Sequence, residues 1–332
     1  MAKFKIYKLK FTTPLHLGDE RADYGISLQT IHSDTMYSAI ISSLAKIGVE
    51  IPENADFGFT ISSLFPFTTE KNNDEDVYFL PKLKSQSIPS PNLQDFAKRI
   101  KKIEWLDVEF FNKHINGENL FTDDFDENQL FGKYLSVKSI DEEFITKEVN
   151  PRVKVPRDYS VEKDAEPFYM ERIYFKENSG LYFIADGDTS KIDIALEVLK
   201  DQGIGTDRTI GNGFFEFETN EIEIKIPKAE FLTNLSMFIP ENKEQLEALL
   251  NSDEIAYDFQ KRGGWITDAG LNTYRKNSIY MFNEACVFKS EKEADIVTIK
   301  GKTVDLKPEI EHINISHPIY RVGKSIFIPI KL

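Results

Sequence analysis

The sequence predicts an α+β protein of two domains, on three observations. The chain has 332 residues, which is long for one domain. Up to Pro227 its apolar residues follow the order strand–helix–strand twice, and after Pro227 a shorter series of strands and a helix begins. Hydrophobic residues make up 41% of the chain and charged residues 29%, so each domain can bury a core.

The first half of the N-terminal domain, 1–227, is predicted as strand, loop and helix. The strand runs from Phe4 to Phe11, and its apolar residues change phase at Tyr7, which is typical of a β-bulge. A polar loop follows at 18–25. Ser33-Asp34 is an N-cap pair for a helix that ends at Gly48. The apolar residues of this helix recur at helical spacing: Met36, Ile40, Leu44 and Ile47.

The second half of this domain repeats the order. Strands at Arg172–Phe175 and Leu181–Ile184 are joined by Asn178-Ser179-Gly180, which indicates a hairpin. A helix from Thr189 to Lys200 and a strand from Phe214 to Thr219 follow. The apolar side of the helix consists of Ile192, Ala195, Leu196 and Leu199. This βαββαβ order is that of a ferredoxin-like domain, interrupted here by a long insertion.

The insertion covers about 66–168 and contains much of the irregular sequence. Residues 72–76 are a predicted loop, and Lys98–Lys102 gives a basic helical face. Between Lys147 and Arg157, cations alternate with valines between prolines, which predicts an extended arm with one cationic edge. The cations towards the end of that arm are Arg152, Lys154 and Arg157.

The smaller α+β domain occupies 228–332. Leu235, Met237 and Ile239 alternate as in a strand, and Glu244–Leu250 is a predicted helix. The segment 318–330 is a predicted hairpin that turns at Gly323.

Charge and composition exclude several classes of protein. A net charge of −14 argues against a protein that coats nucleic acid nonspecifically, although it leaves room for a local basic groove. The acidic clusters at 123–127 and 141–143 are solvated loops or a surface that faces a partner. Cys286 is the only cysteine, which excludes a disulfide framework within the chain. With no signal peptide and no apolar run of membrane-spanning length, we expect a soluble cytosolic protein without a membrane partner.

The glycine-rich stretch from Gly203 to Gly213 is the strongest local signal. Gly203, Gly205, Gly211 and Gly213 permit positive φ and close approach of the backbone to a ligand. Successive N–H groups in such a loop form an anion nest, to which Arg208 can add a forked donor. The alternative is an irregular connector without a ligand. The stretch leads into a strand, so it is neither a P-loop nor a dinucleotide fingerprint.

Two further candidates are ambiguous from the residues alone. His16 is a general base, a base-stacking ring or a structural residue. The segment Arg262-Gly-Gly-Trp265 places a cation and an aromatic ring beside a nucleotide, or is a bend with a core tryptophan. The other four histidines have no carboxylate at helical or hairpin spacing, so metal catalysis is unsupported and we expect no metal.

Several motifs in order together resemble one family. They are Pro14-Leu-His-Leu-Gly18, Ile31-His-Ser-Asp-Thr-Met-Tyr-Ser-Ala39, Phe65-Pro-Phe67, Phe79-Leu-Pro-Lys82, the glycine-rich stretch, Arg262–Trp265, Gly301–Pro308 and His317–Gly323. This set resembles the repeat-associated mysterious protein (RAMP) superfamily. Within it, the chain is similar to the subunits that cap the 5′ handle of the guide RNA (crRNA) in type III-A (Csm) CRISPR effector complexes. One departure follows Glu284, where Ala285-Cys286 replaces an expected Gly-Ser pair.

The resemblance implies a fold and a function. It implies two ferredoxin-like, RRM-related domains with a protruding β-hairpin thumb. It also implies a non-catalytic, RNA-binding subunit without a cofactor, in contact with the crRNA 5′ handle, with a large polymerase-like subunit and with the first backbone RAMP subunit. Together with the motifs, it gives this expected RNA-binding set: His16, Gly18, Ser33, Lys82, Arg152, Lys154, Arg157, Gly203, Gly205, Arg208, Gly211, Gly213 and Arg262.

Two other functions stay open at this point. Some RAMP relatives are metal-independent endoribonucleases that cut repeat RNA with a histidine near the glycine loop, and His16 is the candidate for that role. A protein-only scaffold would leave the glycine loop and the cationic arm unexplained.

Overall fold

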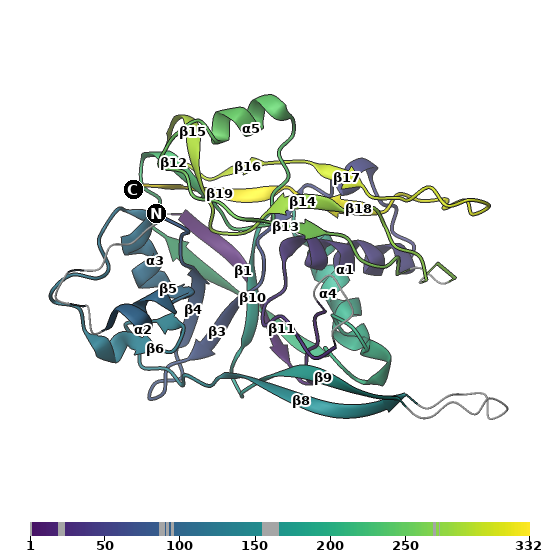
Figure 1. The fold of residues 1–332 in the computed structure, drawn as a ribbon, viewed down its shortest axis with the longest axis horizontal. Helices are drawn as coiled ribbons and strands as arrows, with labels where there is room; N and C mark the ends of the chain where they lie inside the picture. The colour runs from purple at the N-terminus through teal and green to yellow at the C-terminus, as the bar shows by residue number, and fades with distance from the viewer. Residues whose placement is uncertain are drawn as a thin grey trace.

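The computed structural model contains one large sheet, one small sheet and the helices that cover them (Figure 1). It describes residues 2–18, 24–85, 90, 93, 96–154, 166–267, 270–271 and 273–332, with backbone alone at Lys154 and Glu166. The mixed α+β prediction is confirmed. Most of the predicted loop at 18–25, and Arg157 of the predicted arm, lie outside the described residues.

The large sheet has nine strands among the described residues. Its order is β11-β1-β10-β3-β4-β5-β7-β6, and β2 pairs with β10 beside β3. The strands are β1 (Ala2–Phe11), β2 (Phe59–Ile61), β3 (Phe65–Thr69), β4 (Asp76–Pro81), β5 (Trp105–Asp107), β6 (Leu130–Phe131), β7 (Tyr134–Leu135), β10 (Gly180–Gly187) and β11 (Phe215–Ile224). Part of the predicted insertion is regular structure, because β4 to β7 extend this sheet.

The predicted bulge in the first strand is wrong. β1 pairs in unbroken register with β10 and with β11. Phe4 and Ile6 are buried on one face of the sheet, and Tyr7 and Leu9 are buried on the other. The apolar phase changes because both faces are covered, and the backbone itself is regular.

Two helices cover one face of the sheet. They are α1 (Ser33–Lys46) and α4 (Ser190–Gln202), and the four apolar residues predicted for the second are all buried. The other face packs against α3 (Val108–Ile115) and the C-terminal sheet. The remaining helices are α2 (Ala97–Lys101) and α5 (Lys243–Leu249), with 3₁₀ turns η1 (Glu53–Ala55), η3 (Glu127–Gln129) and η4 (Arg208–Ile210). No helix in the described part is long and apolar enough to cross a membrane.

The predicted hairpin around Asn178 is also wrong. β9 (Glu166–Phe175) pairs with β8 (Ile145–Lys154), whereas β10 enters the large sheet. The reason lies in Leu181–Ile184, which is buried at every position and so suits a central strand covered on both faces. β8 and β9 form a separate hairpin that projects from the body of the molecule (Figure 1). The extended arm is thus one strand of this hairpin.

The C-terminal part has a four-stranded sheet and two short ribbons. The sheet order is β15-β12-β19-β16, and the ribbons are β13-β14 and β17-β18. The strands are β12 (Ala229–Asn234), β13 (Phe259–Arg262), β14 (Ile279–Phe282), β15 (Val287–Ala294), β16 (Thr298–Lys300), β17 (Thr303–Asp305), β18 (Tyr320–Val322) and β19 (Ser325–Ile330).

Two predictions for this part need correction. The strand lies at 229–234 and ends before the alternating residues. Leu235 packs in the core of the large sheet, whereas Met237 and Ile239 pack in a smaller cluster with Met281. The segment 318–330 is not a hairpin, because β18 pairs with β17 and β19 with β12 and β16. Gly323 lies where the chain passes from the β17-β18 ribbon to the four-stranded sheet. Gly301 packs against this position. A Cβ on Gly301 would lie 2.2 Å from the carbonyl oxygen of Gly323.

Candidate functional site

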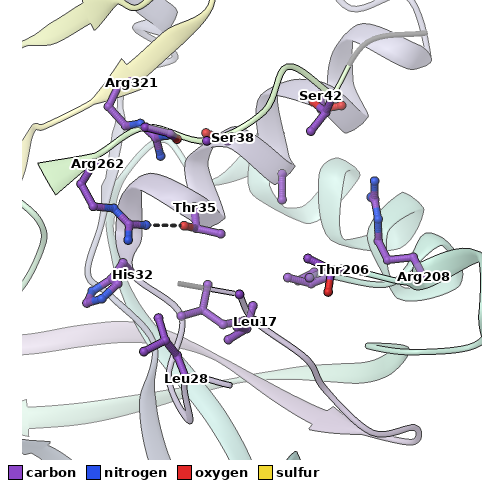
Figure 2. A pocket seen from close by; sticks show the side chains of 18 of the residues that line it. Leu17, Leu28, His32, Thr35, Ser38, Ser42, Thr206, Arg208, Arg262 and Arg321 are labelled. Carbon is purple, nitrogen blue, oxygen red and sulfur yellow. Dashed lines mark hydrogen bonds between the residues drawn. The ribbon is translucent and has the colours of Figure 1, made fainter. Parts of the chain in front are cut away.

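A pocket of about 260 Å³ lies between α1, the glycine-rich stretch and the C-terminal ribbons. Gly18, Gly205, Arg208 and Arg262 all line it, although they come from three distant parts of the sequence. Figure 2 shows Arg262 and Arg321 on one side of α1 and Arg208 across the pocket. The pocket therefore brings together four of the thirteen residues predicted from the sequence.

One face of α1 lines the pocket with hydroxyl groups. Thr35, Ser38 and Ser42 follow one another at helical spacing, with Ala39 between them. The opposite face carries the buried residues Met36, Ile40 and Leu44. The apolar spacing in the sequence indicated only this buried face. The hydroxyl stripe recurs with the same helical period on the opposite face.

Asp34 joins the pocket wall to the C-terminal part of the chain. Its side chain is fully buried, and it accepts from Arg262 Nε at 2.9 Å and from Arg321 Nη1 at 2.5 Å. Burial opposes ionisation, but the two guanidinium groups hold the pKa of this carboxyl well below its usual range. Arg262 also donates to Thr35 Oγ1 at 2.9 Å, the dashed line in Figure 2.

Ser33 and Asp34 are thus not the N-cap of α1. The N-cap is His32, without a side-chain cap, and Ser33 and Asp34 are buried in the first turn. Ser33 Oγ accepts from the backbone N–H of Met237 at 2.9 Å. Both residues bind the C-terminal part of the chain. These tertiary contacts hold Ser33 and Asp34 inside the first turn, although serine and aspartate alone favour the N-cap position.

The pocket carries an excess of positive charge in an acidic protein. Arg208, Arg262, Lys276 and Arg321 line it, and the buried Asp34 is the carboxylate that offsets them. Burial, and then the nearby Arg321, lower the pKa of Lys276 to about 8. Within the described ranges, no salt bridge is found for Lys276 or Arg208. Such a pocket is suited to an anion.

Three glycines of the glycine-rich stretch make close contacts within the chain. A Cβ on Gly203, Gly205 or Gly213 would lie 2.6, 2.5 or 1.9 Å from a backbone oxygen of the chain itself. Gly213 N donates to Pro14 O at 2.8 Å, and Thr206 N donates to His16 O at 3.0 Å. These two N–H groups are therefore already bonded within the chain, and the anion nest stays a prediction. Gly211 has open space around it and a φ of +90°.

His16 is a structural residue by its contacts. Its ring is 1% exposed, and Nδ1 lies 2.7 Å from the carbonyl oxygen of Glu171, to which it donates. The ring of Tyr24 stacks on it at 5.9 Å. Because the ring is buried and its Nδ1 is already bonded, a substrate cannot reach it in this conformation.

The other predicted residues lie apart from the pocket. Lys82 lines a second cavity of about 480 Å³, and burial lowers its pKa. Arg152 is on β8, in the projecting hairpin, and Lys154 ends that strand.

His32 lines both cavities and pairs with Glu284. Its Nδ1 lies 2.9 Å from Glu284 Oε1, across 252 positions of sequence, so spacing rules had no means of finding the pair. Burial alone would lower the pKa of His32, but Glu284 raises it above its usual value. Among the described residues, no group of three or more histidine, cysteine, aspartate or glutamate side chains is placed to hold a metal ion.

The sequence departure after Glu284 coincides with an unusual backbone. Ala285 has a φ of +62°, in the left-handed region that glycine adopts without a penalty. The glycine expected there from the resemblance would suit this conformation.

The Arg262–Trp265 segment is not a bend around a core tryptophan. Arg262 pairs with Asp34, and Trp265 is 50% exposed, so it is not a core residue. The cation beside the indole ring is Arg275, whose guanidinium carbon lies 4.6 Å from the ring centroid.

Comparison with known proteins finds the same family throughout. The family described as the CRISPR Csm4 C-terminal domain matches residues 227–330. The chain is 29% identical over 252 residues to Csm4 of Thermococcus onnurineus (strain NA1), which covers 70% of this chain and 74% of that protein.

Two solved structures resemble its fold over the whole chain. One is a chain of the crystal structure of a Csm3–Csm4 subcomplex of the type III-A interference complex, with 20% identity, a TM-score of 0.58 and full coverage of both chains. The other is a chain of a Csm1–Csm4 cassette in complex with cA4, with 20% identity and a TM-score of 0.57. It covers 100% of this chain and 99% of that one. The resemblance predicted from the ordered motifs is confirmed.

Proposed function

We propose a function from one premise: this chain is a relative of the Csm4 proteins, which are RAMP subunits of type III-A CRISPR systems. The chain is a non-catalytic cytosolic subunit that holds the 5′ handle of the guide RNA. The observation that supports this most is the pocket beside α1, where four cations and three hydroxyl side chains of α1 line a space open to an anion.

The chemistry of the pocket suits the backbone of single-stranded RNA. Arg208 and Lys276 can pair with a phosphate without breaking an existing salt bridge, whereas Arg262 and Arg321 are paired with Asp34. Thr35, Ser38 and Ser42 offer donors and acceptors to phosphates and to ribose 2′-hydroxyl groups. Positive charge confined to one pocket explains how an acidic protein holds one RNA segment without coating RNA in general.

The projecting hairpin extends this surface. Arg152 and Lys154 lie on β8, and we place them along the guide RNA beyond the pocket, together with Arg157. The strand order β11-β1-β10-β3, with α1 and α4 on one face, supports a ferredoxin-like domain within 1–227. The second ferredoxin-like domain is assigned to 228–332.

The partners follow from the relatives. The crystal structures of relatives contain Csm1 with Csm4 and Csm3 with Csm4. For this chain we propose the corresponding contacts, with a large polymerase-like subunit and with the first backbone subunit. The enclosed ring of His16 argues against the endoribonuclease alternative.

The test is guide occupancy of a complex reconstituted with its Csm1-type and Csm3-type subunits. Arg208→Ala and Lys276→Ala should each weaken guide retention under a salt challenge, because each removes a charge-assisted hydrogen bond worth about 1.5–3 kcal/mol. Lys243→Ala, at an exposed i,i+4 pair on α5, is the matched control and should retain the guide. Thermal melting of each free subunit checks that folding is preserved.

Two results would contradict the proposal. One is full guide retention by both pocket variants across the salt series. The other is cleavage of repeat RNA by the purified chain in EDTA that is lost in His16→Ala, which would support an endoribonuclease.

A further inference from the structure

The loop that follows β13 carries the exposed aromatic ring of Trp265. We propose that Trp265, with Arg275 against it, is a stacking site for one base of the single-stranded RNA whose phosphates lie in the pocket beside α1. This rests on the proposed function and adds a base contact to it.

The geometry of the pair is unusual for a surface loop. Trp265 and Arg275 face one another as an antiparallel bridge, and the guanidinium carbon of Arg275 lies 4.6 Å from the centroid of the indole ring. Half of the tryptophan surface remains exposed to solvent. Arg275 contacts the ring, and the described part of the chain provides no carboxylate partner for it.

The position of the pair connects it to the pocket. Gly264 and Thr267, on either side of Trp265 in sequence, line the pocket, as does Lys276, which follows Arg275. The backbone N–H of Lys276 donates to the Gly264 carbonyl at 3.1 Å, and that of Ile266 donates to the Tyr274 carbonyl at 2.9 Å. Paired strands lie only ~5 Å apart. The backbone of the pair therefore runs along the edge of the pocket, directly beside the pocket residues Gly264 and Lys276.

The chemistry favours a nucleobase as the occupant. An exposed aromatic ring beside cations is how proteins hold unpaired bases, because every base has a π-face and the backbone phosphates need positive charge nearby. A guanidinium stacked on the indole extends the flat surface and adds an attraction to an electron-rich base. The pocket supplies the cations for the phosphates, and the Trp265–Arg275 pair supplies the ring.

The experiment uses the assembled complex and a guide RNA that carries the fluorescent base 2-aminopurine at one handle position at a time. Stacking on an aromatic ring quenches this base. We expect one position whose emission is low in the wild type and rises several-fold in Trp265→Ala. Trp265→Phe should restore most of the quenching, since the ring is kept, and Arg275→Ala should give an intermediate emission.

The outcomes separate this proposal from the proposed function. If Arg208→Ala and Lys276→Ala release the guide but no handle position responds to Trp265→Ala, the stacking site is wrong and the phosphate pocket stands. If Trp265→Ala instead loses a partner subunit at unchanged emission, the exposed ring is a protein contact and the proposal is overturned. If neither pocket variant affects the guide, the function itself fails.

Discussion

Asp34 in the first turn of α1 accepts a hydrogen bond from Arg262 Nε at 2.9 Å, across 228 positions of sequence. Arg321 binds the same carboxylate from a third segment. One fully buried carboxylate thus joins the N-terminal helix to two C-terminal ribbons and holds two of the arginines that line the pocket.

Removing the charge of Asp34 should make the protein easier to unfold. Asp34→Asn leaves two buried guanidinium groups without their counter-ion, and we expect a loss of about 3–5 kcal/mol in the free energy of unfolding. Urea denaturation measures this. Asp295→Asn at the surface is the control and should change little, so an unchanged midpoint in Asp34→Asn would contradict the structural role of the cluster.

The His32–Glu284 pair should make stability depend on pH. Glu284 raises the pKa of His32 above 6.5 although burial opposes this. The contribution of His32 to the free energy of unfolding is therefore complete below pH 6.5 and is lost as pH rises through the folded-state pKa. The pKa of Glu284 is lowered by His32 although burial opposes this, so its contribution is complete above about pH 4.5 and is lost as pH falls through the folded-state pKa. The pair is therefore most effective between about pH 4.5 and 6.5.

Glu284→Gln should reveal this window. The difference in the free energy of unfolding between wild type and variant should be largest near pH 6 and should shrink above pH 6.5. A difference that stays constant from pH 5 to 9 would show that the two side chains do not titrate as a pair.

Lys276 should give guide binding its own pH dependence. Its pKa of about 8 in the free protein should rise when a phosphate binds. Its contribution to guide binding is then complete below pH 8 and disappears as pH rises through the higher pKa of the bound state. Guide retention at pH 7 to 9.5 tests this, since the arginines of the pocket stay charged throughout. Lys276→Gln should remove the slope, and an equal slope in both proteins would place the titrating group elsewhere.

Two glycines of the loop should differ sharply when changed to alanine. Gly213→Ala puts a Cβ 1.9 Å from the backbone oxygen of Ile204, so we expect a loss of about 3 kcal/mol or more in the free energy of unfolding. Gly211→Ala meets no neighbouring atom, and its φ of +90° leaves it with only the smaller backbone penalty, about 1 kcal/mol. Thermal and urea melts compare the two. Equal destabilisation would mean that the close approach at Gly213 is relieved at little cost.

Local patterns predicted the helices better than the strand partners. Residues 192–199 gave the buried side of α4 because helical periodicity is a property of the segment itself. Strand pairing depends on distant segments. The sequence around Gly180 and Gly323 therefore predicted hairpin turns, although the strands that follow these glycines pair with β1 and β12. The same limit applies to the site. Arg208 and Arg262 stood out as motifs, whereas Lys276, Arg321 and Glu284 gain their meaning only from the fold that gathers them.

The place of β1 in the sheet has a consequence for protein synthesis. Its residue Ile6 pairs with Ile184, and its other partner strand lies later still, so β1 is synthesised about 180 residues before its first partner. At ~5–20 residues per second, this strand waits roughly 10–35 s with apolar residues on both faces. Lysines interrupt it at four positions, namely Lys3, Lys5, Lys8 and Lys10. Their charges keep nascent chains on neighbouring ribosomes from pairing through this segment until β10 arrives.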